Sequence, residues 1–195
     1  MLRAMVFIDY ENFDIALKKY YKNLGKAFPR LDYQKLASNI CSEIKLDNIA
    51  LIKTMLFVPE PDDFLLQDTY WQNFKRSISG LQSKPFLDVI SGRFVTYPVE
   101  SSIPKDIKNK LTYYKVEKGT DINIASNMLT MAFNNSYDIA VLVSCDSDYA
   151  TVLNTLRTLG KLSSLAIVDG QRSRLLNKAD SCYTMREAFF NASLR

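Results

Sequence analysis

Four aspartates stand where carboxylates could act together. Asp9 directly follows a short apolar run near the N-terminus, and Asp121 follows a Lys-Gly-Thr step. Asp146 and Asp148 come just after a second apolar run. One carboxylate at a strand end is commonly a helix cap, but several that converge repel one another and raise each other's pKa. A divalent cation relieves that repulsion, so the pattern predicts an acidic site for Mg²⁺ or Mn²⁺ and phosphoryl chemistry.

The absence of histidine narrows the chemistry further. With no histidine in 195 residues, Ser-His-Asp and Cys-His nucleophiles and histidine-bound zinc are excluded. The three cysteines, Cys41, Cys145 and Cys182, are odd in number and far apart, which indicates reduced thiols. No apolar stretch could span a bilayer, and the first residues do not resemble a signal peptide. We therefore expect a cytoplasmic protein that contacts no membrane.

Strands and helices are expected to alternate along the chain, as in a parallel sheet covered on both faces. Strands are predicted at 5–8, 49–58, 86–90, 139–143 and 162–168. Helices are predicted from the cap candidate Asn12 to about 22, after the cap candidate Asp32, over 64–81, from Thr120 or Asp121, over 150–159 and from about 185. In a strand order of 3-2-1-4-5, Asp9 and Asp146 face one crevice at the carboxyl ends of neighbouring strands.

Residues 93–117 do not fit this alternation. Two β-prone stretches, 93–99 and 111–116, flank a polar linker, and we interpret them as an excursion from the main sheet, such as a hairpin. No repeat, low-complexity segment or linker divides the chain, so one domain is expected over residues 1–195.

Three motifs together carry a family resemblance. Phe-Ile-Asp9-x-x-Asn12, Lys118-Gly119-x-Asp121 and Ser144-x-Asp146-Ser-Asp148-Tyr occur in order, on matching elements and at matching separations. They resemble the NYN domain in its LabA-like branch (the former DUF88 group), a relative of PIN-domain nucleases, and the resemblance covers residues 4–185. It implies a three-layer, Rossmann-like PIN fold and a metal-dependent ribonuclease. On matching positions, Asp9, Asp121 and Asp146 would hold the metal, and Asn12 and Asp148 would complete the catalytic site.

Two residues depart from the family pattern. Cys145 stands where the family usually has glycine, and Asn127 stands where it often has an aspartate in the central helix. Asn127 can bind water or phosphate but adds no negative charge. An RNA-binding member without activity is therefore one alternative, and metal-dependent RNA cleavage separates the two. A phosphatase of the haloacid dehalogenase type is another, because Asp9-Tyr10-Glu11 resembles its Asp-x-Asp motif, although its second aspartate would be a glutamate.

A basic stretch suggests how a substrate would reach the acidic residues. Five lysines against two acidic residues lie between Lys105 and Lys118, although net charge over the whole chain is only +4. Cationic side chains can follow a phosphate backbone, and tyrosines can stack on unpaired bases. We expect single-stranded RNA to contact Arg93, Lys108, Lys110, Tyr113, Lys115 and Lys118. The alternative is a solvated face with no ligand, with RNA bound elsewhere, as at Arg172, Arg174 and Lys178. The sequence does not decide whether the chain forms a homo-oligomer.

Overall fold

One seven-stranded sheet runs through the molecule in the order β4-β3-β2-β1-β5-β6-β7. The computed structural model describes all residues, 1–195. The strands are β1 (Leu2–Asp9), β2 (Ile49–Glu60), β3 (Leu87–Pro98), β4 (Tyr113–Lys118), β5 (Ile139–Val143), β6 (Leu162–Val168) and β7 (Ser181–Met185). The helices are α1 (Tyr10–Asn23), α2 (Tyr33–Ser42), α3 (Thr69–Gln82), α4 (Thr120–Phe133), α5 (Ala150–Thr158) and α6 (Glu187–Ala192). Three short 3₁₀ turns are η1 (Leu65–Gln67), η2 (Ser147–Tyr149) and η3 (Arg174–Asn177).

The five inner strands confirm the predicted parallel order. From β3 through β2, β1 and β5 to β6, every pairing is parallel, which is the order 3-2-1-4-5 for the five strands expected from sequence. The prediction was incomplete at both edges, where β4 adds an antiparallel strand and β7 a parallel one. The sheet is therefore mixed, with seven strands in place of about five.

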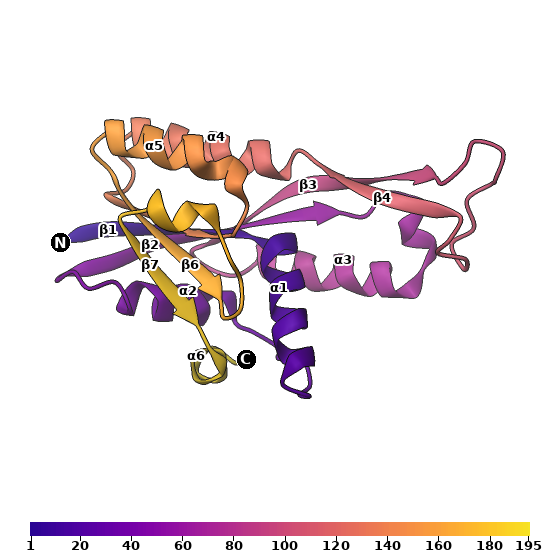
Figure 1. The fold of residues 1–195 in the computed structure, drawn as a ribbon, viewed down its shortest axis with the longest axis horizontal. Helices are drawn as coiled ribbons and strands as arrows, with labels where there is room; N and C mark the ends of the chain where they lie inside the picture. The colour runs from indigo at the N-terminus through magenta and orange to yellow at the C-terminus, as the bar shows by residue number, and fades with distance from the viewer.

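Helices cover both faces of the sheet, and strand alternation decides which side chains they meet (Figure 1). In β1, Val6 and Ile8 pack into the cluster that includes α1, α2 and α6 residues, whereas Met5 and Phe7 pack against α4 and α5. Successive side chains of a strand point to opposite faces. Asp9, next after Ile8, therefore faces α4 and η2, where its partners lie.

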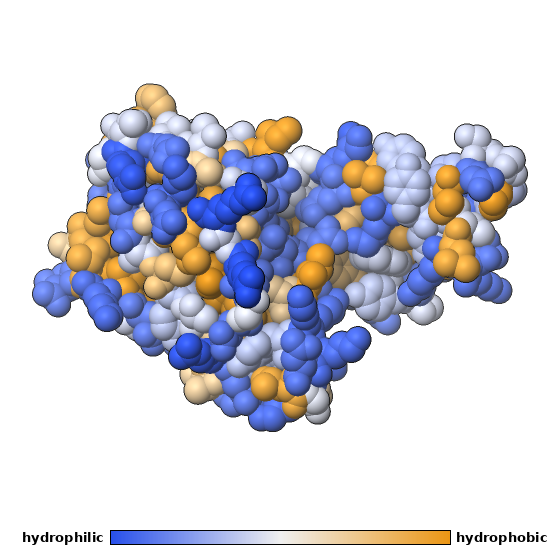
Figure 2. Space-filling view, viewed as in Figure 1, coloured by the Kyte–Doolittle hydropathy of each residue, from blue (hydrophilic) through white to orange (hydrophobic).

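The predicted excursion is a part of the main sheet. The strand predicted at 86–90 does not end there but continues from Leu87 to Pro98 and pairs antiparallel with β4, with Arg93 opposite Lys118. The two strands and their connection project well beyond the other strands, with α3 along one side (Figure 1). Hydrophobic atoms gather at the tip of this projection (Figure 2), where Val99, Ile103 and Leu111 are exposed.

One predicted helix cap was wrong, whereas the predicted start of α4 at Thr120 is confirmed. Asp9, not Asn12, caps α1, because its carboxylate accepts a hydrogen bond from the backbone N–H of Asn12. Helix α4 begins after Gly119, whose φ of 86° lies in the left-handed region that favours glycine. Asp121 thus stands in the first turn of α4 with its carboxylate free for other partners, whereas Asp32 caps α2 as predicted.

The C-terminal tail contains the strand that the sequence did not reveal. Residues Ser181–Met185 pair with β6 but lie at the sheet edge and are half exposed, so they carry no apolar run. The last helix begins at Glu187, close to the expected residue 185. None of the helices is long and apolar enough to cross a membrane.

Candidate active site

Asp9 is held at the carboxyl end of β1 by the loop that follows β5. Ile8 pairs with Val143 across the two parallel strands, so Asp9 and Ser144 leave the sheet side by side. The Ser144 hydroxyl donates to Asp9 Oδ2 at 2.9 Å, and the Asn12 backbone N–H donates to Oδ1 at 3.3 Å. Only 4% of Asp9 is exposed, so these bonds replace much of the hydration that burial removes.

Tyr149 joins Asp9 to Asp121. The Tyr149 hydroxyl lies 2.8 Å from Asp121 Oδ1 and 3.5 Å from Asp9 Oδ2. These two carboxylate oxygens are therefore separated by no more than the sum of those distances, although Asp9 and Asp121 are 112 positions apart in sequence. Asp121 is exposed and Tyr149 is buried, so the hydroxyl lies at the floor of the site.

Asp146 and Asn12 organise the loop beside this pair. The Asp146 backbone N–H donates to the Ser144 hydroxyl at 3.1 Å, and its carboxylate caps η2 by accepting from the Asp148 N–H at 3.0 Å. Asn12 Oδ1 accepts from the Cys145 N–H at 3.0 Å, which ties the loop to α1. Asp146 is half-buried and Asp148 is exposed. All five predicted catalytic residues thus lie at one edge of the sheet.

The electrostatics of Asp9 fit a site that lacks a compensating charge. The pKa of Asp9 is raised to about 6, chiefly by burial. The bonds from Ser144 and Asn12 act to lower this pKa, whereas the charges of Asp121 and Asp146 act to raise it. The repulsion among converging carboxylates that the sequence predicted is therefore present at Asp9.

Sequence reasoning missed two glutamates at this edge. Burial and the neighbouring Glu11 carboxyl raise the pKa of Glu117 to about 8, so Glu117 is mostly protonated at neutral pH. Burial also acts to raise the pKa of Glu11, but Glu117 and the Lys115 ammonium outweigh it and hold it below its usual value. Lys115 Nζ lies 2.5 Å from Glu11 Oε1. Glu11 lies within the Asp9-x-x-Asn12 motif, and Glu117 directly precedes Lys118. Only the pairing of β4 with β3 brings Glu117 to this edge of the sheet.

The oxygen atoms at the site are suitable ligands for a hard cation, but they are not arranged as a complete metal site. All the atoms that could coordinate a metal are oxygens. The buried Asp9 carboxylate lies beside Asp121, and neither forms a salt bridge with a lysine or arginine. Nevertheless, no group of three or more Asp, Glu or Cys side chains is close enough together to hold a metal ion. The Asp146 carboxylate, engaged with the Asp148 N–H, would have to turn toward the pair to complete a set of three.

Gly92 fixes the distance between β3 and the start of α4, and so the position of Asp121. A Cβ at residue 92 would lie 2.1 Å from Thr120 Oγ1 and 3.0 Å from the Thr120 backbone nitrogen. The Thr120 hydroxyl is itself buried with no hydrogen-bond partner. Only glycine allows this approach of strand and helix.

We expect Gly92→Ala to destabilise the protein by about 1–2 kcal/mol, because the first turn of α4 must move away from β3. Gly80→Ala is the matched control. Gly80 lies inside α3 with no atom within 4 Å of an added Cβ, so alanine there should stabilise by about 0.5–1 kcal/mol. Urea unfolding of both variants measures the difference. Equal stabilities for the two would contradict the role of Gly92.

The sequence matches the family model of the NYN domain over residues 3–186, which is nearly its whole length. The chain belongs to the NYN domain family. This family is part of the PIN-like nuclease superfamily, so the match favours a nuclease over the haloacid dehalogenase alternative. Membership in the LabA-like branch stays a prediction.

A structural relative supports the fold alone. The NYN chain is similar to a crystal structure of a protein of unknown function from Vibrio parahaemolyticus, with a TM-score of 0.55 and 14% sequence identity. The similarity covers 100% of this chain and 96% of that one. No curated protein gives a significant match to the sequence.

Both departures from the NYN pattern are accommodated locally. Cys145 has no positive φ, so its backbone does not require glycine, and burial raises the pKa of its thiol to about 11. The thiol therefore stays protonated at neutral pH and is a poor nucleophile. The Asn127 amide donates to the Asn123 carbonyl one turn earlier at 2.8 Å, where an aspartate could not donate.

Of the six residues predicted to bind RNA, four are exposed cations and two, Lys115 and Tyr113, already contact other side chains. Lys108 and Lys110 are exposed near the tip of the β3–β4 projection, and Arg93 and Lys118 are exposed at its base. Lys115 is committed to Glu11 and lies 3.6 Å from the Phe94 ring centroid. The half-buried Tyr113 packs against the Phe64 ring, 4.9 Å between centroids. These contacts leave the four exposed cations as the candidate RNA contacts on this projection.

Proposed function

We propose that this protein is a metal-dependent ribonuclease that hydrolyses phosphodiester bonds of single-stranded RNA. The observation that carries the proposal is the convergence of Asp9 and Asp121 on the Tyr149 hydroxyl, beside Asp146, in a chain of the NYN family. Carboxylates from separate elements that meet without a partner cation suit Mg²⁺ or Mn²⁺.

Each residue then has a defined task. Asp9 and Asp121, together with Asp146 once its carboxylate turns toward them, would hold the cation. Such a cation would lower the pKa of a bound water and stabilise charge on the phosphate. Asp148, which is exposed at this edge, or Asn12, whose Oδ1 accepts from the Cys145 N–H, would orient the attacking water. Hydrolysis by water is favoured over a covalent intermediate, because the Cys145 thiol is protonated and no histidine activates a hydroxyl.

The direct test is incubation of the purified protein with mixed single-stranded RNA and Mn²⁺, followed by electrophoresis. Cleavage that stops on addition of EDTA supports the proposal. Asn127, which removes one charge from the family pattern, keeps a second candidate open, an RNA-binding NYN protein without activity. Binding of RNA without cleavage under any divalent cation would select that candidate.

The exposed lysines of the projection provide a separate prediction about the path of RNA. Changing Lys108 and Lys110 together to glutamine should weaken RNA binding and reduce the slope of log Kd against log salt, because fewer counterions are released. Affinity for Mn²⁺ should not change. Fluorescence anisotropy at several salt concentrations provides the measurement.

The matched control replaces Arg172 and Lys178, on the alternative basic surface, with glutamine. Loss of affinity in this second pair, with an unchanged salt slope in the first, would move the RNA path to the alternative surface.

A further inference from the structure

An aromatic pocket lies between α1, α3 and the base of the β3–β4 projection. Its volume is about 350 Å³, and its apolar lining includes Ile15, Tyr70, Trp71, Phe74 and Phe94. Tyr70 and Ile15 are more than half exposed, so the pocket opens to solvent beside them. The acidic site does not use these side chains, yet the pocket is also lined by Glu11, two residues after Asp9.

The rings around Trp71 stand on edge to the indole. Tyr70, Phe74 and Phe94 lie with centroids 5.2, 5.6 and 5.4 Å from Trp71 and with interplanar angles of 83°, 81° and 68°. No protein ring is stacked parallel to the indole, and the Lys115 ammonium lies over it at 5.8 Å from the ring centroid. Flat aromatic ligands prefer offset stacking on such a surface, and edge-on neighbours can enclose them.

The charges at the pocket cancel in pairs. Lys115 Nζ lies 2.5 Å from Glu11 Oε1, and Lys18 Nζ lies 2.6 Å from Asp14 Oδ2. With two ammonium groups and two carboxylates, the pocket suits neither a free anion nor a free cation. It suits a neutral, flat ligand whose polar edge can exchange hydrogen bonds with both kinds of group.

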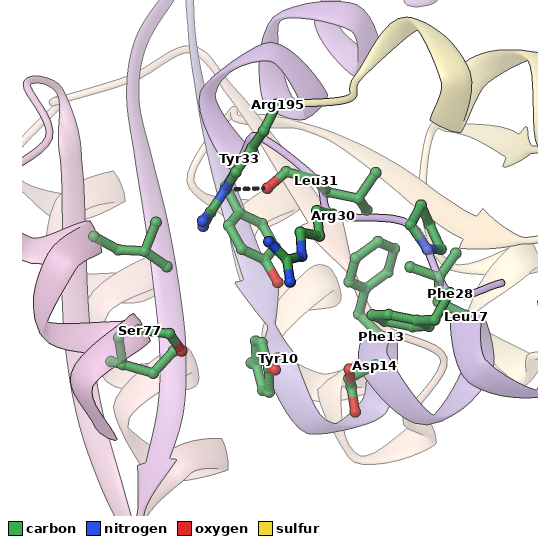
Figure 3. A pocket seen from close by; sticks show the side chains of 13 residues that line it. Tyr10, Phe13, Asp14, Leu17, Phe28, Arg30, Leu31, Tyr33, Ser77 and Arg195 are labelled. Atoms are coloured by element: carbon green, nitrogen blue, oxygen red, sulfur yellow. Dashed lines mark hydrogen bonds between the residues drawn. The ribbon is translucent and has the colours of Figure 1, made fainter. Parts of the chain in front are cut away.

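The position of the pocket relates that ligand to the acidic site. Glu11 lines the pocket and lies two residues after Asp9 on α1, and its carboxylate pairs with Lys115 of β4, two residues before Glu117. A larger cavity of about 430 Å³, lined by Phe28, Arg30 and Tyr33 (Figure 3), contains none of the acidic-edge residues. Of these two cavities, the aromatic pocket is therefore the one that adjoins the site.

We propose that the aromatic pocket binds one unpaired nucleobase of the RNA, next to the phosphodiester bond that is cleaved. This inference rests on the proposed ribonuclease function and adds how the substrate is held. A base inside a duplex could not enter, so the pocket selects single-stranded RNA. Stacking on Trp71 supplies affinity without strong sequence preference, because every base has an aromatic face.

Trp71, the single tryptophan of the chain, reports on the pocket directly. The probe is a ten-nucleotide single-stranded RNA, added in EDTA to the Asp146→Asn protein so that it is not cleaved. We expect saturable quenching of tryptophan fluorescence with the same Kd as anisotropy reports. With 2-aminopurine placed at each position in turn, the analogue should be quenched at one position, beside the bond that the wild-type protein cleaves.

Variants provide a second readout. Trp71→Leu should weaken RNA binding on the order of 5- to 100-fold, and Trp71→Phe should restore most of the affinity because it keeps a stacking face. Phe28→Leu, in the cavity of Figure 3, is the matched control and should change affinity less than about twofold. Circular dichroism of each variant checks that the protein is folded.

The outcomes separate the two proposals. RNA that binds by anisotropy without quenching Trp71, or that binds equally well to Trp71→Leu, would overturn the base pocket while leaving the ribonuclease function intact. Absence of both RNA binding and cleavage in the wild-type protein would overturn the proposed function, and the base pocket with it.

Discussion

Asp146→Asn should lower metal-dependent RNA cleavage by at least about 100-fold while leaving the fold intact. Asparagine keeps the shape of the side chain, and its amide oxygen can still accept from the Asp148 N–H and cap η2. The change removes the negative charge that Asp146 adds beside Asp9, and with it part of the attraction for a divalent cation. Initial cleavage rates of a labelled single-stranded RNA at fixed Mn²⁺ measure the effect.

A matched control separates this effect from a general loss of surface charge. Asp47 is an exposed aspartate just before β2, at the opposite edge of the sheet. Asp47→Asn should cleave RNA at the wild-type rate. If Asp146→Asn cleaves as fast as Asp47→Asn, the assignment of Asp146 to the site is wrong, and a different cluster must carry any activity.

Asp9→Asn should stabilise the metal-free protein relative to wild type, and this stabilisation should be larger at neutral pH than in acid. The folded-state pKa of Asp9 is about 6, above the value of about 3.9 for an unfolded chain. The folded protein therefore binds this proton more tightly, and its stability falls as pH rises from about 4 to about 6. Above that range the ionised, buried carboxylate costs on the order of 2–3 kcal/mol.

The variant has no carboxyl group at residue 9, so it should lack this pH dependence. Between pH 4 and pH 7, the difference in unfolding free energy between variant and wild type should move by about 2–3 kcal/mol in favour of the variant. Urea unfolding in EDTA at several pH values measures this. Asp148→Asn, an exposed position at the same edge, is the control. A constant difference between Asp9→Asn and wild type at all pH values would contradict the burial argument.

The two expected results describe one compromise. Asp9 destabilises the metal-free fold because it is buried beside other carboxylates, and the same crowding is what would attract a cation. Mn²⁺ should therefore raise the unfolding midpoint of the wild-type protein and have a smaller effect on Asp9→Asn. Stability given up at a functional site is a common pattern in enzymes.

Much of the site could be predicted from the sequence, because its main residues follow local signals. Apolar runs marked β1 and β5, and an aspartate after each run pointed to the carboxyl edge of a parallel sheet. The alternation of strands and helices predicted a mostly parallel sheet, and the order 3-2-1-4-5 expected for a Rossmann-like PIN fold is that of the five inner strands. Motifs of this kind consist of residues that are close together in the chain, so they can be recognised from the sequence alone.

Partners that meet across long separations depended on the tertiary structure. Tyr149 meets Asp9 from 140 residues away, and Glu117 reaches the edge only because β4 pairs with β3. Gly92 lies just beyond the strand predicted at 86–90, and only its contact with Thr120 shows that strand and helix approach closely there. No local signal marked Trp71 within the helix predicted over 64–81. Its place in a pocket beside Glu11 arises from the packing of α1, α3 and the β3–β4 projection, which no local pattern encodes.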